Sequence, residues 1–160
     1  MKRVADIMTR NVESVEPGTT VRDAADKMKT RNIGSLPVCD NKRLVGTLTD
    51  RDVTIRVTAE GRDPAQTKVG DIMSKEVVTV TPDQELSEAE QLMHDHQVRR
   101  LPVVDESHQL VGYLAMAKVA QAEQDEQVTG KVLRGISEPK TPASRKIAAG
   151  ARVRTGKNGD

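Results

Sequence analysis

The sequence has one cysteine, one aromatic residue and almost no net charge, and each of these shortages excludes a class of protein. Cys39 stands alone among 160 residues, so an intramolecular disulfide and a multi-cysteine zinc site are both impossible. Tyr113 is the only aromatic residue, which argues against recognition of bases by stacked aromatic side chains. Lys and Arg total 25 against 24 Asp and Glu, so the formal net charge is +1. A surface that binds nucleic acid or anionic lipid over its whole area is therefore not expected.

Long hydrophobic runs are also missing. No run approaches the roughly 20 residues of a membrane-spanning helix, and the charged N-terminus has no apolar segment of signal-peptide length. Hydrophobic residues make up 36% of the chain, enough for an aliphatic core if the elements pack economically. We therefore expect a soluble, cytoplasmic protein without contact with the membrane.

The sequence contains an internal repeat. Four short blocks recur in the same order at an offset of 65 residues, which becomes 66 after an insertion near Ser107. The matched blocks are Val4–Thr9 with Val69–Ser74, Val12–Pro17 with Val77–Pro82, Ile33–Val38 with Val98–Val103, and Leu44–Leu48 with Leu110–Leu114. Four matches in register indicate a tandem duplication.

Each repeat predicts the order strand, helix, strand, strand, helix. In the first repeat we expect a strand at Val12–Val15, a helix with apolar positions Val21, Ala24, Ala25 and Met28 after a Thr19 or Thr20 cap, strands at Leu36–Cys39 and Leu44–Leu48, and a helix from near Thr49. A unit of roughly 55 residues is marginal alone. We therefore expect two units, residues 1–63 and 64–133, to share a buried face about a pseudo-twofold axis, with a cleft between them.

Residues 134–160 differ in composition. The segment Gln121–Ile136 could extend the last helix, but from Glu138 onward Pro, Gly and small residues without a period predict a disordered tail. This tail has six basic and two acidic residues, a net charge of +4, which leaves −3 for the rest of the chain. Contact with nucleic acid is conceivable only through the tail, and a solvated tail is the simpler interpretation.

Recognisable catalytic motifs are absent from the sequence. It has no GxSxG, Walker A, GxGxxG or HExxH pattern. His94 and His96 are two residues apart on an expected helix, so their side chains diverge and cannot chelate one ion. We expect no catalytic residues and no metal site.

The segment from Gly46 to Asp52 has the pattern GxxTxxD at the junction of a strand and a helix. Glycine would let a ligand approach the backbone, and the Asp52 carboxylate could accept hydrogen bonds from both hydroxyls of a sugar diol. The alternative is structural, because Thr49 and Asp52 also have the spacing of a helix-capping pair.

Comparison of the repeats favours the binding interpretation. At the positions of Gly46, Thr49 and Asp52 the second repeat has Gly112, Ala115 and Lys118, so a helix start does not require the carboxylate. Where the first repeat has Gly34 and Ser35, the second has Arg99 and Arg100. Paired arginines suit phosphate oxygens; exposed charges that only aid solubility are the alternative.

Residues 4–133 resemble the CBS-domain family, and in particular stand-alone bacterial proteins with a tandem pair. The resemblance rests on DIM at the start of both repeats, LPV in both, and GTLTDRD in the first. It implies an α+β fold, a Bateman module of two βαββα units. It also implies clefts that bind an adenine nucleotide such as ATP, ADP or AMP as a regulatory ligand.

The resemblance assigns residues to two clefts. The first combines ribose-binding, base-lining and phosphate-binding residues: Gly46, Thr49, Asp52, Val77, Val78, Val98, Arg99 and Arg100. The second combines Ala115 and Lys118 with Val12, Glu13, Gly34 and Ser35, and it lacks the aspartate, the hydroxyl and the arginine pair. We therefore expect one occupied site per chain, with adenine held by apolar contact and backbone hydrogen bonds.

The leading functional hypothesis is a non-enzymatic sensor of adenine nucleotides that needs no cofactor. It would act as a homodimer and signal to an unknown effector protein, since ligand in the cleft would favour one arrangement of the two units. The alternative is a structural or protein-interaction module without physiologically relevant nucleotide binding.

Overall fold

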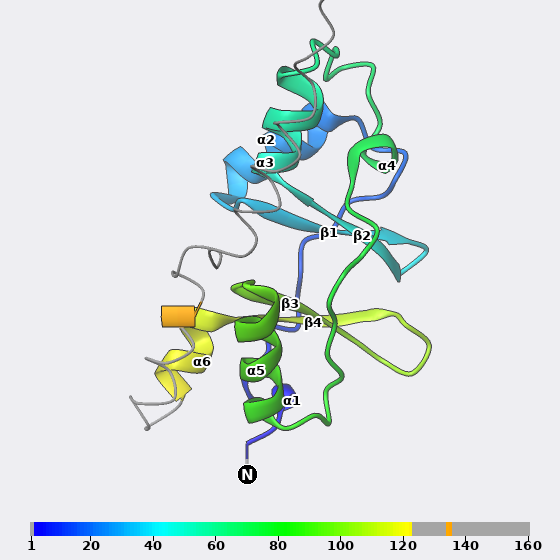
Figure 1. Cartoon of the computed structure of the whole chain (residues 1–160). Helices are drawn as coiled ribbons and strands as arrows, with labels where there is room; N and C mark the ends of the chain where they lie inside the picture. The colour runs from blue at the N-terminus through cyan, green and yellow to red at the C-terminus, as the bar shows by residue number, and fades with distance from the viewer. Residues whose placement is uncertain (1, 123–133, 136–160) are drawn as a thin grey trace, which may run out of the picture.

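The computed structural model describes residues 2–122 and 134–135, which form two similar halves, each with a hairpin of two strands and covering helices (Figure 1). In chain order the elements are α1 (Val4–Ile7), α2 (Val21–Arg31), β1 (Ser35–Asp40), β2 (Arg43–Thr49), α3 (Asp50–Val53), the π-helix η1 (Thr54–Thr58), α4 (Val69–Ile72), α5 (Leu86–His96), β3 (Arg100–Val104), β4 (Leu110–Ala115) and α6 (Met116–Ala122). The α+β class is confirmed. The expected tail and most of the expected extension of the last helix lie outside the described residues.

The two hairpins repeat each other in detail. Strand β1 pairs antiparallel with β2, and β3 with β4. Each ladder has a register shift at the same place, after Val38 in one and after Val103 in the other. A bulge bends a strand and increases its twist. The shared irregularity supports the duplication that the sequence indicates.

The strand expected at Val12–Val15 does not form. Only Val15 pairs, in a parallel bridge to Val38, and Val80 pairs with Val103 in the same way. The N–H of Val15 donates to Pro37 O at 3.0 Å, and Cys39 N–H donates to Val15 O at 2.9 Å. Val12 and Glu13, which precede Val15, line a cavity described below.

The long helices form as expected from their apolar spacing. Helix α2 begins after Thr20, whose hydroxyl accepts a hydrogen bond from Asp23 N–H at 3.2 Å, and it buries Val21, Ala24 and Met28. It ends where Asn32 adopts a left-handed conformation with φ of 53°. In α5 the corresponding apolar positions are buried, and Gln97 ends the helix in the same conformation.

The helix expected from Thr49 begins there as α3 but changes to π geometry at Thr54. Of its apolar residues Val57 is buried, whereas Ile55 is 44% exposed. The wider turn of a π-helix shifts the side chains around the axis relative to an α-helix.

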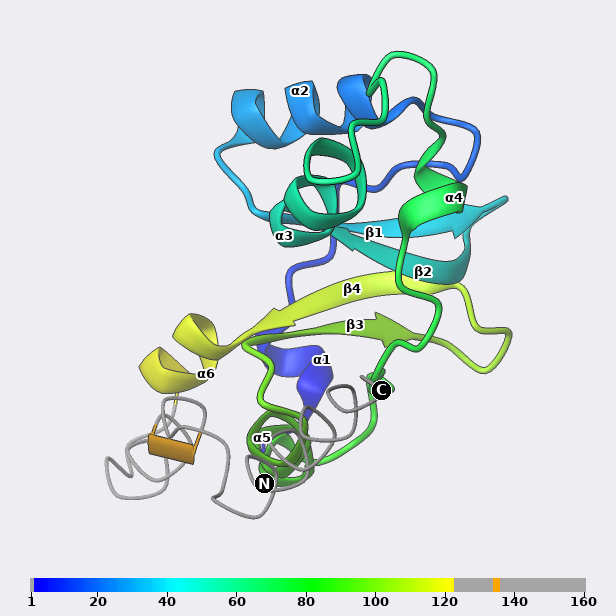
Figure 2. The ribbon, with the colours of Figure 1, turned by 45° about the horizontal axis from the view of Figure 1, so that its top comes forward.

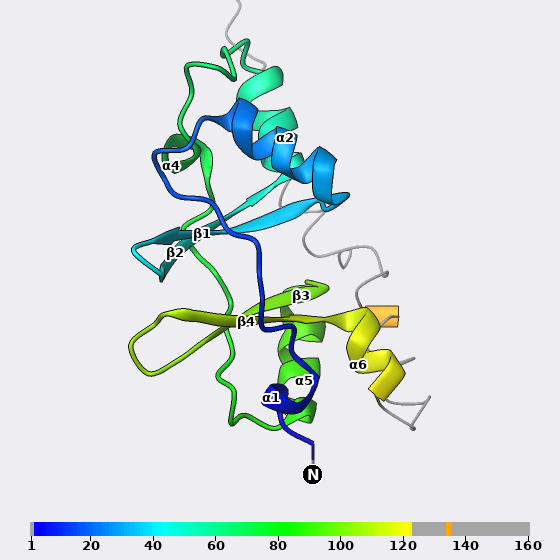
Figure 3. The same ribbon diagram turned by 180° about the vertical axis from the view of Figure 1, so that it is seen from behind.

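The two halves exchange short helices. The core below helix α2 contains Val69 and Ile72 of α4, while Val4 of α1 lies in the core of the second half with Leu86 and Met93. Figure 3 shows α4 beside the first hairpin and α1 beside α5. Backbone bonds secure both crossings: Val69 N–H donates to Thr19 O at 2.8 Å and Val4 N–H donates to Gln84 O at 3.0 Å. The division at residues 63 and 64 therefore separates sequence repeats but not hydrophobic cores.

The hairpins face each other across the boundary between the halves (Figure 2). Two isolated antiparallel bridges, Thr47 with Ser74 and Thr9 with Tyr113, join the strands to the connecting segments. At one end the small cluster of Cys39, Leu44 and Val104 belongs to both halves. The remaining space between the hairpins holds the cavities of interest.

Candidate functional site

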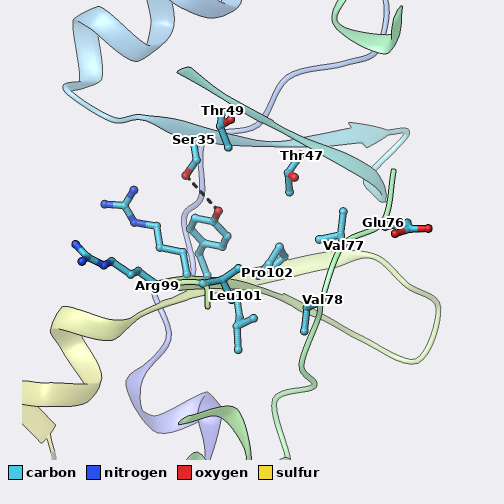
Figure 4. A pocket seen from close by; sticks show the side chains of 12 residues that line it. Ser35, Thr47, Thr49, Glu76, Val77, Val78, Arg99, Leu101 and Pro102 are labelled. Carbon is cyan, nitrogen blue, oxygen red and sulfur yellow. Dashed lines mark hydrogen bonds between the residues drawn. The ribbon is translucent and has the colours of Figure 1, made fainter. Parts of the chain in front are cut away.

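A cavity of about 320 Å³ lies between the two hairpins (Figure 4). All four strands and the segment Glu76–Val78 contribute to its wall. Six of the residues predicted for the first site line it, namely Thr49, Val77, Val78, Val98, Arg99 and Arg100. The structure thus gathers base-lining and phosphate-binding candidates from the second repeat around a hydroxyl from the first.

Gly46 does not line this cavity. A Cβ on Gly46 would lie 2.8 Å from Met73 Sδ and 2.8 Å from Ser74 O, too close for any side chain. Gly112 has the equivalent relation to Met8 and Thr9, with a Cβ 2.6 Å from Met8 Sδ and 3.0 Å from Thr9 O. Both glycines are required where a connecting segment crosses a strand, whether or not a ligand is bound.

Asp52 also lies outside the cavity lining and forms a capping box with Thr49. Its Oδ2 accepts a hydrogen bond from Thr49 N–H at 2.9 Å, while Thr49 Oγ1 accepts one from Asp52 N–H at 3.1 Å. The structural alternative for this pair is therefore present in the fold. The other carboxylate oxygen of the half-buried Asp52 has no hydrogen-bond partner in the described part of the chain.

The charged residues of the cavity lie at opposite ends. Arg99 lies at one end (Figure 4), Arg99 and its neighbour Arg100 are both exposed, and their guanidinium groups form no hydrogen bond or ion pair with other described residues. Glu76 lies at the far end, beyond Val77 (Figure 4). An elongated ligand with an anionic end would be oriented by this arrangement.

Between the charged ends the wall is apolar but offers backbone polar groups. The side chains of Val77 and Val78 are half-buried. Their backbone N–H and C=O groups make no hydrogen bond to the described residues. Since half-buried backbone groups are usually paired, this segment is open to hydrogen bonding by water or by a planar polar ligand.

The sequence interpretation missed several residues of the cavity. Tyr113 is the most informative, because its hydroxyl lies 3.4 Å from Ser35 Oγ across the two halves, a contact drawn in Figure 4. The repeat alignment contained the signal: Tyr113 corresponds to Thr47, and both side chains line the cavity from facing strands. The other missed residues are Thr47, Glu76, Leu101 and Pro102, together with Ser35, which had been placed in the second site only.

A second cavity, of about 250 Å³, lies on the other side of the Ser35–Tyr113 contact. Val12, Glu13, Ser35 and Ala115 line it as predicted for the second site, whereas Gly34 and Lys118 do not, and Lys118 is exposed. The sequence comparison led us to expect a site without an arginine pair, but Arg31 and Arg100 both line this cavity. Arg31 escaped notice because it comes from the end of α2 and not from the position equivalent to Arg100.

Neither a metal centre nor a membrane span is found in the part of the chain that the structure describes. No three residues among its His, Cys, Asp and Glu are grouped so that they could hold a metal ion. His94 instead contacts its neighbour Asp95, with Nδ1 and Oδ1 3.3 Å apart. None of the described helices has the length and apolar character needed to cross a membrane.

Comparison with known proteins identifies both repeats. The family model for the CBS domain matches residues 4–58 and 69–125. The CBS domain-containing protein YhcV of Bacillus subtilis is 44% identical over 137 residues, which cover 86% of this chain and 96% of YhcV. Hypoxic response protein 1 of Mycobacterium tuberculosis is 38% identical over 122 residues, which cover 76% of this chain and 85% of that protein.

Solved structures agree with this assignment. The crystal structure of hypoxic response protein I with two coordinated zinc ions has a TM-score of 0.71 and 38% identity, covering 77% of this chain and all of the other. The structure of CBSX2 in complex with AMP has a TM-score of 0.67 and 32% identity, covering 75% of this chain and 94% of the other.

Proposed function

The chain belongs to the CBS-domain family as a tandem pair, and we propose that it is a non-enzymatic regulatory module that binds an adenine nucleotide in the first cavity. The observation that carries the proposal is the gathering of Arg99 and Arg100 at one end of a cavity whose middle is walled by Val77 and Val78. AMP in the complex of CBSX2, at 32% identity, supports the same ligand class for this chain.

In this proposal each part of the nucleotide meets a different part of the wall. The phosphates lie at Arg99 and Arg100, whose unpaired guanidinium groups can form bidentate, charge-assisted hydrogen bonds. The base lies against the valines and bonds to the open backbone groups of the Val77–Val78 segment. The ribose lies toward Thr49, with the unpartnered oxygen of Asp52 as the acceptor for its hydroxyls. Gly46 allows the connecting segment to reach this wall and takes no part in binding.

The expected affinity is micromolar. Each charge-assisted hydrogen bond contributes about 1.5–3 kcal/mol, and several such bonds must offset association costs of at least about 4 kcal/mol. A Kd of about 1 μM corresponds to about 8 kcal/mol. The charged and apolar residues that line the cavity are consistent with that value.

Nucleotide binding could be signalled to a partner protein because residues of both halves line the cavity. A nucleotide in contact with Thr49 of the first repeat and Arg99 of the second favours one arrangement of the halves. We propose that an effector protein recognises that arrangement and that the chain acts as a homodimer. A structural module that binds no nucleotide is the competing function.

Calorimetry separates these functions. ATP, ADP, AMP, NADH and S-adenosylmethionine are titrated into the wild-type protein and into Arg99→Ala. Arg62→Ala is the matched control, because Arg62 is exposed and lies outside both cavities. We expect micromolar binding of at least one adenine nucleotide, weakened about tenfold or more by Arg99→Ala and unchanged by Arg62→Ala. If no ligand binds the wild-type protein at millimolar concentration, the structural function is correct.

A further inference from the structure

The two cavities share one wall. Ser35, Arg100 and Tyr113 line both of them, and the contact between the Ser35 and Tyr113 hydroxyls lies in that wall. By contrast, Arg99 lines the first cavity only and Arg31 the second only. A group that binds the Arg100 guanidinium from one side therefore changes what is available on the other side.

The second cavity is positively charged in spite of its glutamate. Glu13 Oε1 lies 2.8 Å from Arg31 Nη2, and Glu13 Oε2 lies 3.5 Å from Lys27 Nζ, so two cations share one carboxylate. Among the lining residues, Arg31 and Arg100 give two positive charges against the one negative charge of Glu13, a net of +1, and Lys27, which lies outside the lining, also pairs with Glu13. Neutral donors stand beside them, in the Asn11 amide and the hydroxyls of the shared wall.

The second cavity is unsuited to a purine. In the repeat alignment Glu13 corresponds to Val78, which is part of the apolar wall of the first cavity. A base placed there would desolvate a carboxylate and disturb its ion pairs. A small anion avoids that cost, because it needs only the guanidinium groups and the neutral donors.

We propose that the second cavity binds a phosphate-class anion, and that this anion weakens nucleotide binding in the first cavity by engaging the shared Arg100. The coupling rests on the function proposed above for the first cavity, whereas the anion site does not. Because coupling free energies are reciprocal, a nucleotide in the first cavity weakens the anion to the same extent. Inorganic phosphate and the phosphate group of a second nucleotide offer the same chemistry here.

The first experiment tests the anion site alone. Inorganic phosphate is titrated calorimetrically, at constant ionic strength in a chloride buffer, into the full-length wild-type protein, Arg31→Gln and Arg99→Gln. We expect phosphate to bind the wild-type protein and Arg99→Gln equally, and Arg31→Gln about tenfold or more weakly. Equal binding by the wild-type protein and Arg31→Gln, or weakening by Arg99→Gln alone, overturns the site. Thermal melting checks that each variant is folded. Substitution of Arg31 should affect stability little, because its side chain is 60% exposed.

The second experiment tests the coupling. AMP is titrated into the wild-type protein at increasing phosphate concentrations. We expect the Kd for AMP to rise by about fivefold or more and then to reach a plateau, as two distinct sites require. For Arg31→Gln without phosphate, we expect the Kd for AMP to equal the wild-type value. Added phosphate should then leave the Kd of this variant unchanged. A Kd that rises without limit, or a response that survives in Arg31→Gln, means direct competition in the first cavity and overturns the coupling.

The two experiments also separate this inference from the function proposed above. If AMP does not bind while phosphate binding still depends on Arg31, the nucleotide function fails and the anion site stands. In another outcome, the wild-type protein binds a second molecule of AMP per chain, which Arg31→Gln does not bind and which adenosine cannot replace. This result supports the site and identifies the phosphate group of a nucleotide as its ligand. If neither phosphate nor AMP gives binding that depends on Arg31, the inference is wrong.

Discussion

The hydroxyl groups of Ser35 and Tyr113 lie 3.4 Å apart across the boundary between the two repeats. This is the one hydrogen bond between side chains that joins the repeats within the described residues. It links the first residue of β1 to the middle of β4, at the wall that the two cavities share. The chain's only aromatic side chain is therefore placed between its two candidate binding sites.

Replacing this hydroxyl should cost little stability. Tyr113→Phe keeps the ring and removes one long hydrogen bond, so we expect the free energy of unfolding to fall by about 0.5–1 kcal/mol. Urea denaturation measures the change. Ser35→Ala and the double variant complete a cycle, in which a coupling energy near zero would show that the two hydroxyls do not interact.

Gly46→Ala and Gly112→Ala should both destabilise the fold. Each added Cβ would lie within 3.0 Å of a crossing segment, and overpacking of this kind costs about 1–3 kcal/mol. Gly18→Ala is the matched control, because a Cβ there meets nothing within 4 Å. Urea midpoints that are equal for all three variants would contradict the assignment of Gly46 and Gly112 to backbone crossing.

Asp52→Ala and Asp6→Ala separate helix capping from ligand binding. Asp6 Oδ2 accepts a hydrogen bond from Arg3 N–H at 2.9 Å, just as Asp52 Oδ2 does from Thr49 N–H, but Arg3 lines neither cavity, whereas Thr49 lines the first. We expect both variants to lose about 0.5–2 kcal/mol of stability. Only Asp52→Ala should also weaken the AMP binding proposed above, in calorimetry under conditions where both variants are folded. Equal AMP affinities would restrict Asp52 to its capping role.

Cys39 should react slowly with thiol reagents in the native protein. Burial raises the pKa of the Cys39 thiol, and the hydrogen bond with Ser14 opposes this only partly. The neutral thiol is thus favoured by folding, so its contribution to stability is complete below the unfolded-state pKa and is lost as the pH rises toward the folded-state pKa.

Stability at alkaline pH tests this assignment. Urea denaturation over a pH series that spans the ordinary thiol range should show a decline that Cys39→Ala removes, beyond the constant cost of the lost side chain. The rate of reaction with a disulfide reagent should rise steeply in urea. Fast labelling of the native protein would show that the thiol is accessible.

The repeat made much of the fold and site predictable from sequence. Alignment of the blocks placed both hairpins and both long helices, and the contrast between Ser35 and Arg100 indicated the cationic end of the first cavity. Periodicity cannot show which core a short apolar segment joins, so the exchange of α1 and α4 was not foreseen. Nor does spacing distinguish a glycine that admits a ligand from Gly46, which admits a neighbouring backbone. Arg31 was not predicted for the second cavity because it is distant in the sequence from Arg100 and Ala115, and only the tertiary fold brings these residues together.

The exchange of α1 and α4 makes each repeat an incomplete folding unit. A chain cut between residues 59 and 66 would leave Val4 on the N-terminal fragment and its core partners Leu86 and Met93 on the C-terminal fragment. Val69 and Ile72 would be on the C-terminal fragment, and their core would be on the N-terminal fragment. Each fragment alone would expose the vacant groove of its own core and an apolar helix that fits the other fragment. Two such fragments should therefore reassociate into the native arrangement, and the intact chain should unfold as one cooperative unit.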